Sequence, residues 1–431
     1  MQNQIPKNWQ KAKLGDLLKD GVILQIQDGN HGEKHPKQSD FVKNGDRVPF
    51  IMANDLNSGK IDFNNCNYIS KKQADSLRIG FAKSGDVLLT HKGNLGLVSI
   101  VPEMEFDYLI LTPQVTYYRV DKNRLDNHFL KYVFLNPYFQ KELQNISPQS
   151  TRPYVGITAQ RDLEINFIED VQDQKKIAAI LSAFDDKIEV NNNIAKTLEE
   201  MAQVLFKEWF LEFRFPWYEK VEFVNSELGK APKDWTMGTL KQLMDVDHGF
   251  AFPSNKFYKK GDLPVIKIKN ILEDKSTDLS DLDFINTKDF NKNLESFRLN
   301  NGDILIAMTG ATSGKVAILI GDYKEYLLNQ RVGKFKFLED YYKWFCYIFL
   351  TRPSYRTLLL NSSDGSAQGN LSPTQIKSIK LIIPPDNILE EFDSIVNTFY
   401  IEIIKNKLEN QKLAALRDLL LPKLMKGEVR V

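Results

Sequence analysis

Residues 171–214 read VQDQKKIAAILSAFDDKIEVNNNIAKTLEEMAQVLFKEWFLEFR and contain no proline or glycine. Apolar residues recur there at alternating intervals of three and four, which is the spacing of a coiled-coil seam. The seam residues are Leu181, Phe184, Ile188, Ala195, Leu198, Ala202, Leu205 and Trp209. Asn191 is the one polar residue in the seam. Such a helix spans roughly 65 Å, which is too long for one face of a compact domain. It therefore requires an apolar partner of similar length.

A second copy of this helix lies 215 residues later in the chain. The shift needs no gap and relates Ile177 to Phe392, Leu181 to Val396, Phe184 to Phe399, Ile188 to Ile403, Asn191 to Asn406, Leu198 to Leu413 and Leu205 to Leu420. We therefore expect the seam of the first helix to pack against Val396, Phe399, Ile403, Leu413 and Leu420. Asn191 and Asn406 are expected to fix the register at some cost in stability.

Further apolar residues lie beside the seam on both helices. They are Val204, Phe206 and Phe210 on the first helix and Leu408 and Leu419 on the second. They widen each stripe beyond what a two-helix contact needs. A second apolar face on an exposed helix predicts another protein partner.

Composition limits the remaining choices. A chain of 431 residues with 42% hydrophobic content can bury two or three cores. The two cysteines, Cys66 and Cys346, exclude a disulfide framework and suit a reducing cytosol. The first residues lack an apolar signal region, and no run reaches eighteen apolar residues, so we expect a cytoplasmic protein without membrane contact. The net charge of +1 does not by itself indicate an anionic partner.

The repeat extends beyond the helices. Pro6-Lys7-Asn8-Trp9 returns as Pro232-Lys233-Asp234-Trp235, and Ser84-Gly85-Asp86-Val87 returns as Asn301-Gly302-Asp303-Ile304. Alternating apolar runs separated by Gly, Asn and Asp turns predict mixed globular units that are rich in strands. The sequence thus predicts an α+β protein with a tandem internal repeat. Its expected parts are a first globular domain, a long helix, a second globular domain and a second long helix, at residues 1–169, 170–215, 216–385 and 386–431.

Between the repeated landmarks the two units differ. Residues 25–80 and 248–300 share almost nothing recognisable, and their polar loops differ in length. One framework that carries two different variable regions suggests two related but distinct ligands.

These residues resemble the specificity subunit of type I restriction–modification systems over essentially the whole chain. The most specific segments are residues 174–210, which begin Gln174-Lys175-Lys176-Ile177-Ala178, and the tail Leu419-Leu420-Leu421-Pro422-Lys423-Leu424-Met425. The Pro-Lys-x-Trp starts and the Gly-Asp-[Val/Ile]-Leu turns of both halves support the resemblance.

The resemblance implies a pseudo-twofold arrangement of two mixed α/β target-recognition domains, joined by the two long helices as an antiparallel coiled coil. Each domain is expected to read one half of a bipartite, non-palindromic site in double-stranded DNA. The helices are expected to hold two methyltransferase subunits, with restriction (nuclease and translocase) subunits completing the complex. In such families the specificity subunit is not catalytic, and S-adenosylmethionine is expected on the partners rather than on this chain.

Two motifs suggest chemistry but have simpler explanations. The segment from Gly310 to Lys315 resembles a phosphate loop, yet it has three residues between its glycines where four are required, and no Ser or Thr follows the lysine. Asn136-Pro137-Tyr138-Phe139 resembles an amino-methyltransferase motif without its second proline, and the other copy reads Thr351-Arg352-Pro353-Ser354. A turn explains the first motif, and a helix-ending proline explains the second.

Metal binding has little support in the sequence. His31 and His35 are four residues apart, but Gly32 and Pro36 argue against a regular helix there. No second pair of ligands lies nearby in the sequence. We therefore expect no metal site and interpret both histidines as hydrogen-bonding or phosphate-contacting groups.

The expected DNA contacts are basic, polar and aromatic residues in turns and variable loops, since phosphates attract local charge and bases are read by polar side chains. In the first unit they are Lys34, His91, Lys92, Asn94, Gln149, Thr151, Arg152 and Tyr154. In the second unit they are Lys256, Lys259, Lys260, Thr309, Thr312, Ser313, Lys315, Ser366 and Gln368. The alternative for most of the lysines is an ordinary solvated surface. The alternative for the whole chain is a coiled-coil adaptor without DNA specificity, which leaves two elaborate globular units unexplained.

Overall fold

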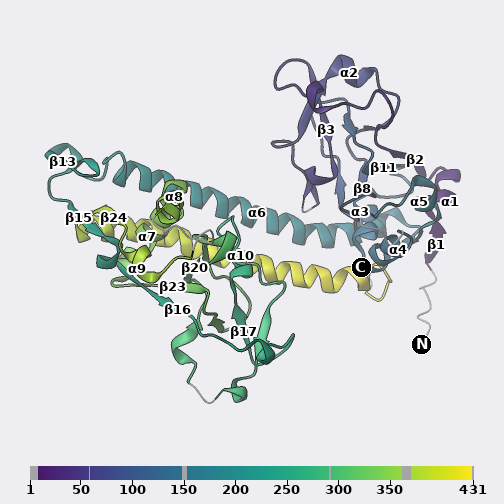
Figure 1. The fold of residues 1–431 in the computed structure, drawn as a ribbon. Coiled ribbons are helices and arrows are strands. Elements are labelled where there is room, and N and C mark those ends of the chain that lie inside the picture. The colour runs from purple at the N-terminus through teal and green to yellow at the C-terminus, as the bar shows by residue number, and fades with distance from the viewer. Residues whose placement is uncertain (1–7, 58, 148–152, 291–292, 362–369, 430–431) are drawn as a thin grey trace. The chain divides into compact units, whose positions relative to one another are not determined.

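The computed structural model describes residues 8–57, 59–147, 153–290, 293–361 and 370–429. The chain divides into two units (Figure 1). Unit 1 comprises Met1–Lys187 with Leu413–Val431, and unit 2 comprises Ile188–Lys412. Each unit therefore contains one globular domain and a part of both long helices.

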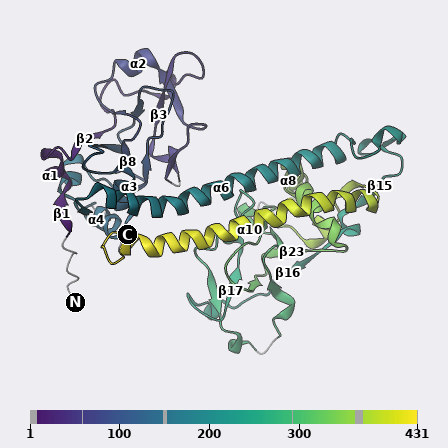
Figure 2. The ribbon, with the colours of Figure 1, turned by 180° about the vertical axis from the view of Figure 1, so that it is seen from behind.

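The two long helices form where the sequence predicts them (Figure 2). They are α6, Val171–Phe210, and α10, Asp386–Leu424. The first helix ends before residue 215, because Phe213 adopts a left-handed φ of 55° that no α-helix continues. Pro422 lies in the last turn of α10, so the backbone hydrogen bond that it cannot donate is missing only at the end of the helix.

In unit 2 the two helices run antiparallel. Asn191 near the start of this part of α6 donates hydrogen bonds of 2.9 Å to Glu409 and Asn410. Trp209, at the other end of α6, contacts Phe392 near the start of α10, with ring centroids 5.8 Å apart. Between these ends, half-buried Leu198, Leu205 and Phe399 pack in one cluster with buried Val396 and Ile403.

The remaining seam residues differ in burial. Asn191 and Asn406 are buried, with 0% and 3% of their surface exposed. In unit 1, buried Leu181 and half-buried Leu420 belong to one apolar cluster. Phe184, Ile188 and Leu413 are half-buried.

The globular domain of unit 1 contains two four-stranded sheets. The first sheet has the order β2-β11-β8-β9, and its strands are Ile23–Asp28, Val115–Val120, Val87–Thr90 and Val98–Ile100. The second sheet has the order β6-β3-β10-β7, and its strands are Asn67–Ser70, Arg47–Ile51, Leu109–Leu111 and Phe81–Ala82. Two separate two-stranded sheets complete the domain. They are β1 (Trp9–Lys13) with β12 (Glu164–Ile168), and β4 (Leu56–Asn57) with β5 (Lys60–Ile61). The helices are α1 (Leu14–Lys19), α2 (Lys71–Asp75), α3 (Asn127–Leu135), α4 (Pro137–Asn145) and α5 (Ile157–Asp162).

The globular domain of unit 2 repeats this plan. Its first sheet is β16-β23-β20-β21, with Met244–His248, Val332–Phe337, Ile304–Ala307 and Val316–Ile318. Its second sheet is β18-β17-β22-β19, with Asp283–Ile285, Leu263–Ile266, Tyr326–Leu328 and Arg298–Leu299. The short pair β15 (Thr236–Thr239) with β24 (Lys380–Ile383) matches β1 with β12, while β13 (Phe223–Ser226) and β14 (Gly229–Pro232) form an additional hairpin. The helices are α7 (Lys343–Leu350), α8 (Pro353–Asn361) and α9 (Pro373–Lys377).

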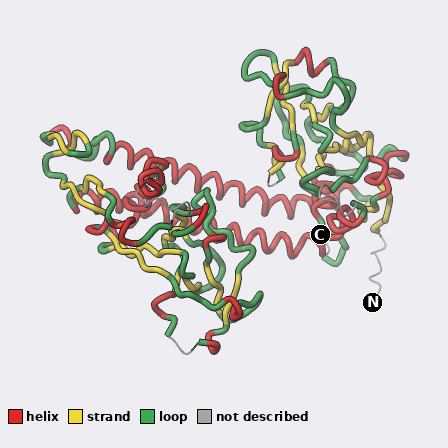
Figure 3. Tube along the Cα trace, in the orientation of Figure 1, coloured by secondary structure: helices red, strands yellow, loops and turns green. Residues whose placement is uncertain are grey.

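The repeat therefore includes the regions whose sequences differ most. The second sheet of each unit contains one parallel pair, β3 with β10 and β17 with β22, between antiparallel neighbours. Two of its four strands in unit 1 and three of its four in unit 2 lie in residues 25–80 and 248–300, where almost no sequence similarity is recognisable. The strand order is the same in both units, whereas the segments that join the strands differ in length and in the short elements they contain. Figure 3 colours these connecting loops green.

A cluster of charges joins the globular domain of unit 1 to its helices. The Asp185 carboxylate on α6 accepts hydrogen bonds from Lys131 (3.1 Å), the Tyr132 hydroxyl (2.6 Å) and Arg417 (2.6 Å). Burial opposes ionisation of Asp185, but the Lys131 ammonium and the three hydrogen bonds outweigh it and hold the pKa of Asp185 below its ordinary value. The position related by the repeat is Tyr400, which stacks on Trp344 at 4.0 Å, so unit 2 has an aromatic joint instead.

We predict that Asp185→Ala lowers the free energy of unfolding of unit 1 by about 3 kcal/mol, because it leaves half-buried cations without their shared partner. Since the pKa is lowered in the folded state, this stabilisation is complete above the unfolded pKa of about 4 and is lost as pH falls through the folded pKa. Urea unfolding, with hydrogen exchange of α3 as a local probe, measures both effects. Exposed Asp186 provides the control, and an equal loss in Asp186→Ala would contradict the prediction.

Among the described residues, none of the helices combines the length and the apolar character that a membrane span needs.

Candidate nucleic-acid interface

Each unit builds the same turn where its two sheets meet. In unit 1 the turn is residues 112–115, between β10 and β11, closed by a 3.1 Å hydrogen bond from the Val115 amide to the Thr112 carbonyl. In unit 2 it is residues 329–332, between β22 and β23, closed at 2.9 Å from Val332 to Asn329. We call these two segments the junction turns.

Two further backbone hydrogen bonds hold each junction turn at equivalent positions. The first residue of each turn donates to the second sheet, Thr112 to Ile51 at 3.0 Å and Asn329 to Ile266 at 3.1 Å. The carbonyl of the third residue accepts from the residue that follows a first-sheet strand, as that of Gln114 does from the His91 amide at 2.9 Å. Arg331 accepts in the same way from Met308 at 3.0 Å. Both turns are therefore fixed to both sheets by their backbone alone.

A glycine lies against each junction turn. A Cβ atom on Gly29 would lie 1.9 Å from the Thr112 carbonyl oxygen, and one on Gly249 would lie 2.3 Å from the Asn329 carbonyl carbon. No side chain fits at either position, because real Cβ contacts are much longer. Sequence reasoning missed these glycines and the turns beside them. The repeated motif Leu111-Thr112-Pro113-Gln114-Val115 and Leu328-Asn329-Gln330-Arg331-Val332 was the available signal.

His91 lies beside the first junction turn but is buried, with 1% of its surface exposed. Its Nδ1 is 3.0 Å from the Val155 carbonyl oxygen, and its Nε2 is 3.6 Å from the Asp28 carboxylate. Burial lowers the pKa of the imidazole, although the Asp28 charge opposes this shift. The neutral ring donates from Nδ1 to the Val155 carbonyl. In this position His91 holds the loop after β8 against the segment before α5.

Other predicted contacts of unit 1 lie on the surface near His91. Lys92 and Tyr154 form an isolated β-bridge, and the Lys92 ammonium is 5.8 Å from the centre of the Tyr154 ring. Both side chains are exposed, as are those of Asn94 and Lys34. The structure thus brings His91, Lys92 and Tyr154 together. Three other predicted contacts, Gln149, Thr151 and Arg152, lie outside the described residues.

The loop after β20 holds four predicted contacts of unit 2. Lys315 forms an ion pair of 2.8 Å with Glu273, and the Thr312 hydroxyl donates to the Thr309 carbonyl at 3.4 Å. Within the described part of the chain, the buried hydroxyl oxygens of Thr309 and Ser313 have no hydrogen-bond partner. Ser366 and Gln368 lie outside the described residues.

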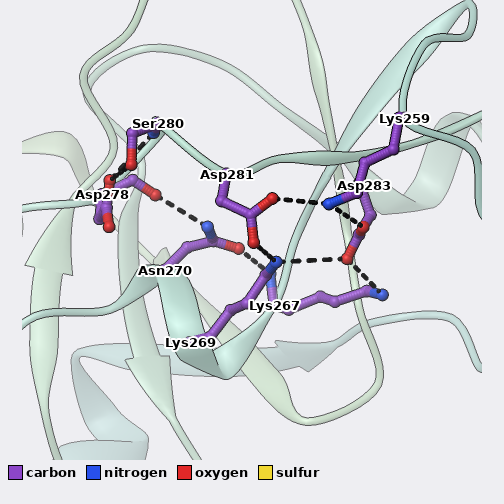
Figure 4. Close-up of polar contacts among 8 residues, drawn as sticks. All are labelled: Lys259, Lys267, Lys269, Asn270, Asp278, Ser280, Asp281 and Asp283. Carbon is purple, nitrogen blue, oxygen red and sulfur yellow. Dashed lines mark hydrogen bonds and ion pairs between the residues drawn. The ribbon is translucent and has the colours of Figure 1, made fainter. Parts of the chain in front are cut away.

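Acidic residues neutralise most of the lysines that the sequence places in the second variable region (Figure 4). Lys259 and Lys269 each lie 2.7 Å from Asp281, and Lys267 lies 2.9 Å from Asp283. Hydrogen bonds from Lys259 and then Lys269 lower the pKa of Asp281 to about 2. Lys256 is 4.0 Å from Asp289, while exposed Lys260 has no ion pair among the residues described. The net positive charge available to a phosphate is therefore smaller than the lysine count suggests.

The motifs that suggested other chemistry have structural roles. The Asn136 side chain caps α4 by accepting a hydrogen bond of 3.1 Å from the Tyr138 amide. Nδ1 of His31 lies 3.3 Å from the Gly29 carbonyl oxygen, and Nδ1 of His35 lies 2.9 Å from the Asn30 carbonyl oxygen. Within the described ranges, no group of three or more His, Cys, Asp or Glu side chains is placed to hold a metal ion.

Exposed apolar residues on the two long helices are related by the same shift of 215 residues as the seam residues. Met201 and Leu416 are 48% and 49% exposed, and Val204 and Leu419 are 60% and 56% exposed. Ile180 and Ile395 are both 37% exposed. We call Met201 with Val204, and Leu416 with Leu419, the outer stripes.

Phe206 and Phe210 do not belong to an outer stripe. Both are buried and contact Phe345 of α7, with ring centroids 5.6 and 4.8 Å apart. The expectation that they widen an exposed face is wrong, because α7 covers them. Leu408 is half-buried against the same cluster, whereas Val204 and Leu419 are exposed as expected.

Comparison with known proteins places this architecture in a family. A family model described as the type I restriction modification DNA specificity domain matches residues 6–200 and again residues 232–416. The type I restriction enzyme MjaIX specificity subunit of Methanocaldococcus jannaschii is 28% identical over 439 residues, which cover 99% of this chain and 95% of that protein. The HindI specificity subunit of Haemophilus influenzae is 25% identical over 449 residues, covering 89% and 94%. The crystal structure of the specificity subunit from M. genitalium has the same fold, with a TM-score of 0.59, 15% identity and coverage of 98% and 97%. Because the family model matches both repeats, the chain belongs to the type I restriction modification DNA specificity family, as a DNA-recognition subunit that is not itself catalytic.

Proposed function

We propose that each unit reads one half of a bipartite, non-palindromic site in double-stranded DNA. The observation that carries this proposal is the combination of one strand order with two different sets of loops. The backbone frame, including the junction turns, is the same in both units, whereas the side chains presented from it differ. Different side chains on one frame read different bases, since base edges in the major groove are distinguished by donor and acceptor patterns.

The outer stripes are the proposed docking sites for two methyltransferase subunits. Each unit carries one stripe with nearly equal exposure, Leu416 with Leu419 in unit 1 and Met201 with Val204 in unit 2. Two equivalent apolar surfaces suit two copies of one partner. S-adenosylmethionine and the methyl transfer then belong to these partners, restriction subunits complete the complex, and the assembly acts on DNA in the cytoplasm.

A coiled-coil adaptor without DNA specificity is the competing function. It explains the long helices but gives no reason for two globular units whose loops differ on a shared frame.

We expect the chain with its cognate methyltransferase subunits to methylate one bipartite site, with binding that weakens as salt rises. The isolated chain should bind no S-adenosylmethionine. Methylated-base sequencing of a random DNA library tests the first expectation, and equilibrium dialysis with labelled S-adenosylmethionine tests the second. Methylation without a defined site would favour the adaptor.

A further inference from the structure

The third residue of the junction turn differs between the units in an informative way. It is Gln114 in unit 1 and Arg331 in unit 2, and both residues hold the same place in the backbone hydrogen-bond pattern. Each accepts through its carbonyl from the residue that directly follows a first-sheet strand, His91 after β8 or Met308 after β20. The backbone is therefore constant at this position, and the side chain alone distinguishes the two units.

Neither side chain has a partner within the described residues. Arg331 is exposed and forms neither an ion pair nor a hydrogen bond there, whereas Lys259, Lys269 and Lys315 are held by carboxylates. The Gln114 side chain is half-buried and likewise forms no hydrogen bond in the described ranges. An unpaired guanidinium and an unpaired amide on a fixed turn are available to a ligand.

The two residue types match two different base edges. Arginine donates two hydrogen bonds to O6 and N7 of guanine, and glutamine pairs with N6 and N7 of adenine. Either side chain can also donate to a phosphate oxygen, but a phosphate contact carries no sequence information. A shared phosphate contact therefore gives no reason for two different side chains at the same backbone position.

We propose that Gln114 and Arg331 are equivalent base-reading residues, Gln114 for an adenine in one half-site and Arg331 for a guanine in the other. The proposal rests on the DNA-recognition function of the two units and names a specificity-determining residue for each. The flanking Gly29 and Gly249 support it, because their missing side chains leave the turn rigidly seated between the sheets.

The test uses the full chain with its cognate methyltransferase subunits on a random-sequence DNA library. Arg331→Gln should abolish the requirement for guanine at one position of one half-site and leave the other half-site unchanged. Methylation of the original site should fall roughly tenfold to a hundredfold, the usual discrimination of a two-bond base contact. Gln114→Arg should remove an adenine requirement from the opposite half-site.

Lys324→Gln is the matched control, because it also replaces an exposed cation with glutamine. Lys324 lies just before β22, whereas Arg331 lies in the junction turn that follows this strand. It should retain both the site and the rate. If Arg331→Gln lowers the rate for all sequences without changing the site, Arg331 contacts phosphate and the proposal is overturned. If the unmodified complex selects no defined site, DNA recognition by the chain fails, which is a separate result.

Discussion

Replacing residues 1–169 with the matching domain of another type I specificity subunit should change one half of the methylated site and leave the other half intact. The exchange moves the complete first globular domain, because β12 ends at Ile168 and α6 begins at Val171. The second domain keeps its own sheets, core cluster and junction turn, all within residues 188–412. Its reading of DNA is therefore expected to persist.

The donor domain must retain the groups that meet the helix, a lysine and a tyrosine at the positions of Lys131 and Tyr132. Methylated-base sequencing of DNA modified by the hybrid complex gives the result directly. The expected outcome is one new half-site beside one unchanged half-site. A change in both halves would show that the two domains do not read independently.

The long helices could be predicted from the sequence because their period is local and uninterrupted. A seam that recurs every three or four residues defines a helix without knowledge of the rest of the fold. The end of α6 was harder to predict, because the residue types at positions 211–214 are all compatible with a helix. The left-handed φ of Phe213 depends on tertiary packing of its ring against Phe223 and Trp235.

The shared topology of the variable regions could not be predicted from the sequence. Strand order depends on which segments pair, and the pairing of β3 with β10 joins residues about sixty positions apart. Many different apolar residues satisfy the same buried strand positions, so the sequence similarity disappears while the pairing remains.

The candidate site could be predicted only in part, because its charges and its burial also depend on residues that are distant in the sequence. The lysines of residues 256–269 form a basic run by themselves, yet Asp281, Asp283 and Asp289 fold back against them. Charge at a surface is a sum over neighbours in space, which a local count omits. The burial of His91 likewise depends on Val155 and Asp28, far away in the sequence.

A charge placed on an outer stripe should prevent a methyltransferase subunit from docking. In Val204→Asp the new carboxylate would lose its water on association without gaining a partner, so affinity for one subunit should fall by at least about a hundredfold. Leu419→Asp should remove the other subunit, and the double variant should remove both. Val204 and Leu419 are exposed. The free energy of unfolding of the chain without its partners should therefore change by less than about 0.5 kcal/mol in either variant.

Gln203→Asp provides the matched control for these variants. It adds the same charge one residue away, but about 100° around the helix from Val204. Native mass spectrometry of the mixed subunits should count two methyltransferase subunits for the control, one for each single variant and none for the double variant. Because the two stripes are equivalent by the repeat, the single variants should weaken assembly to the same degree. Two bound subunits in the double variant would place the docking surface elsewhere on the chain.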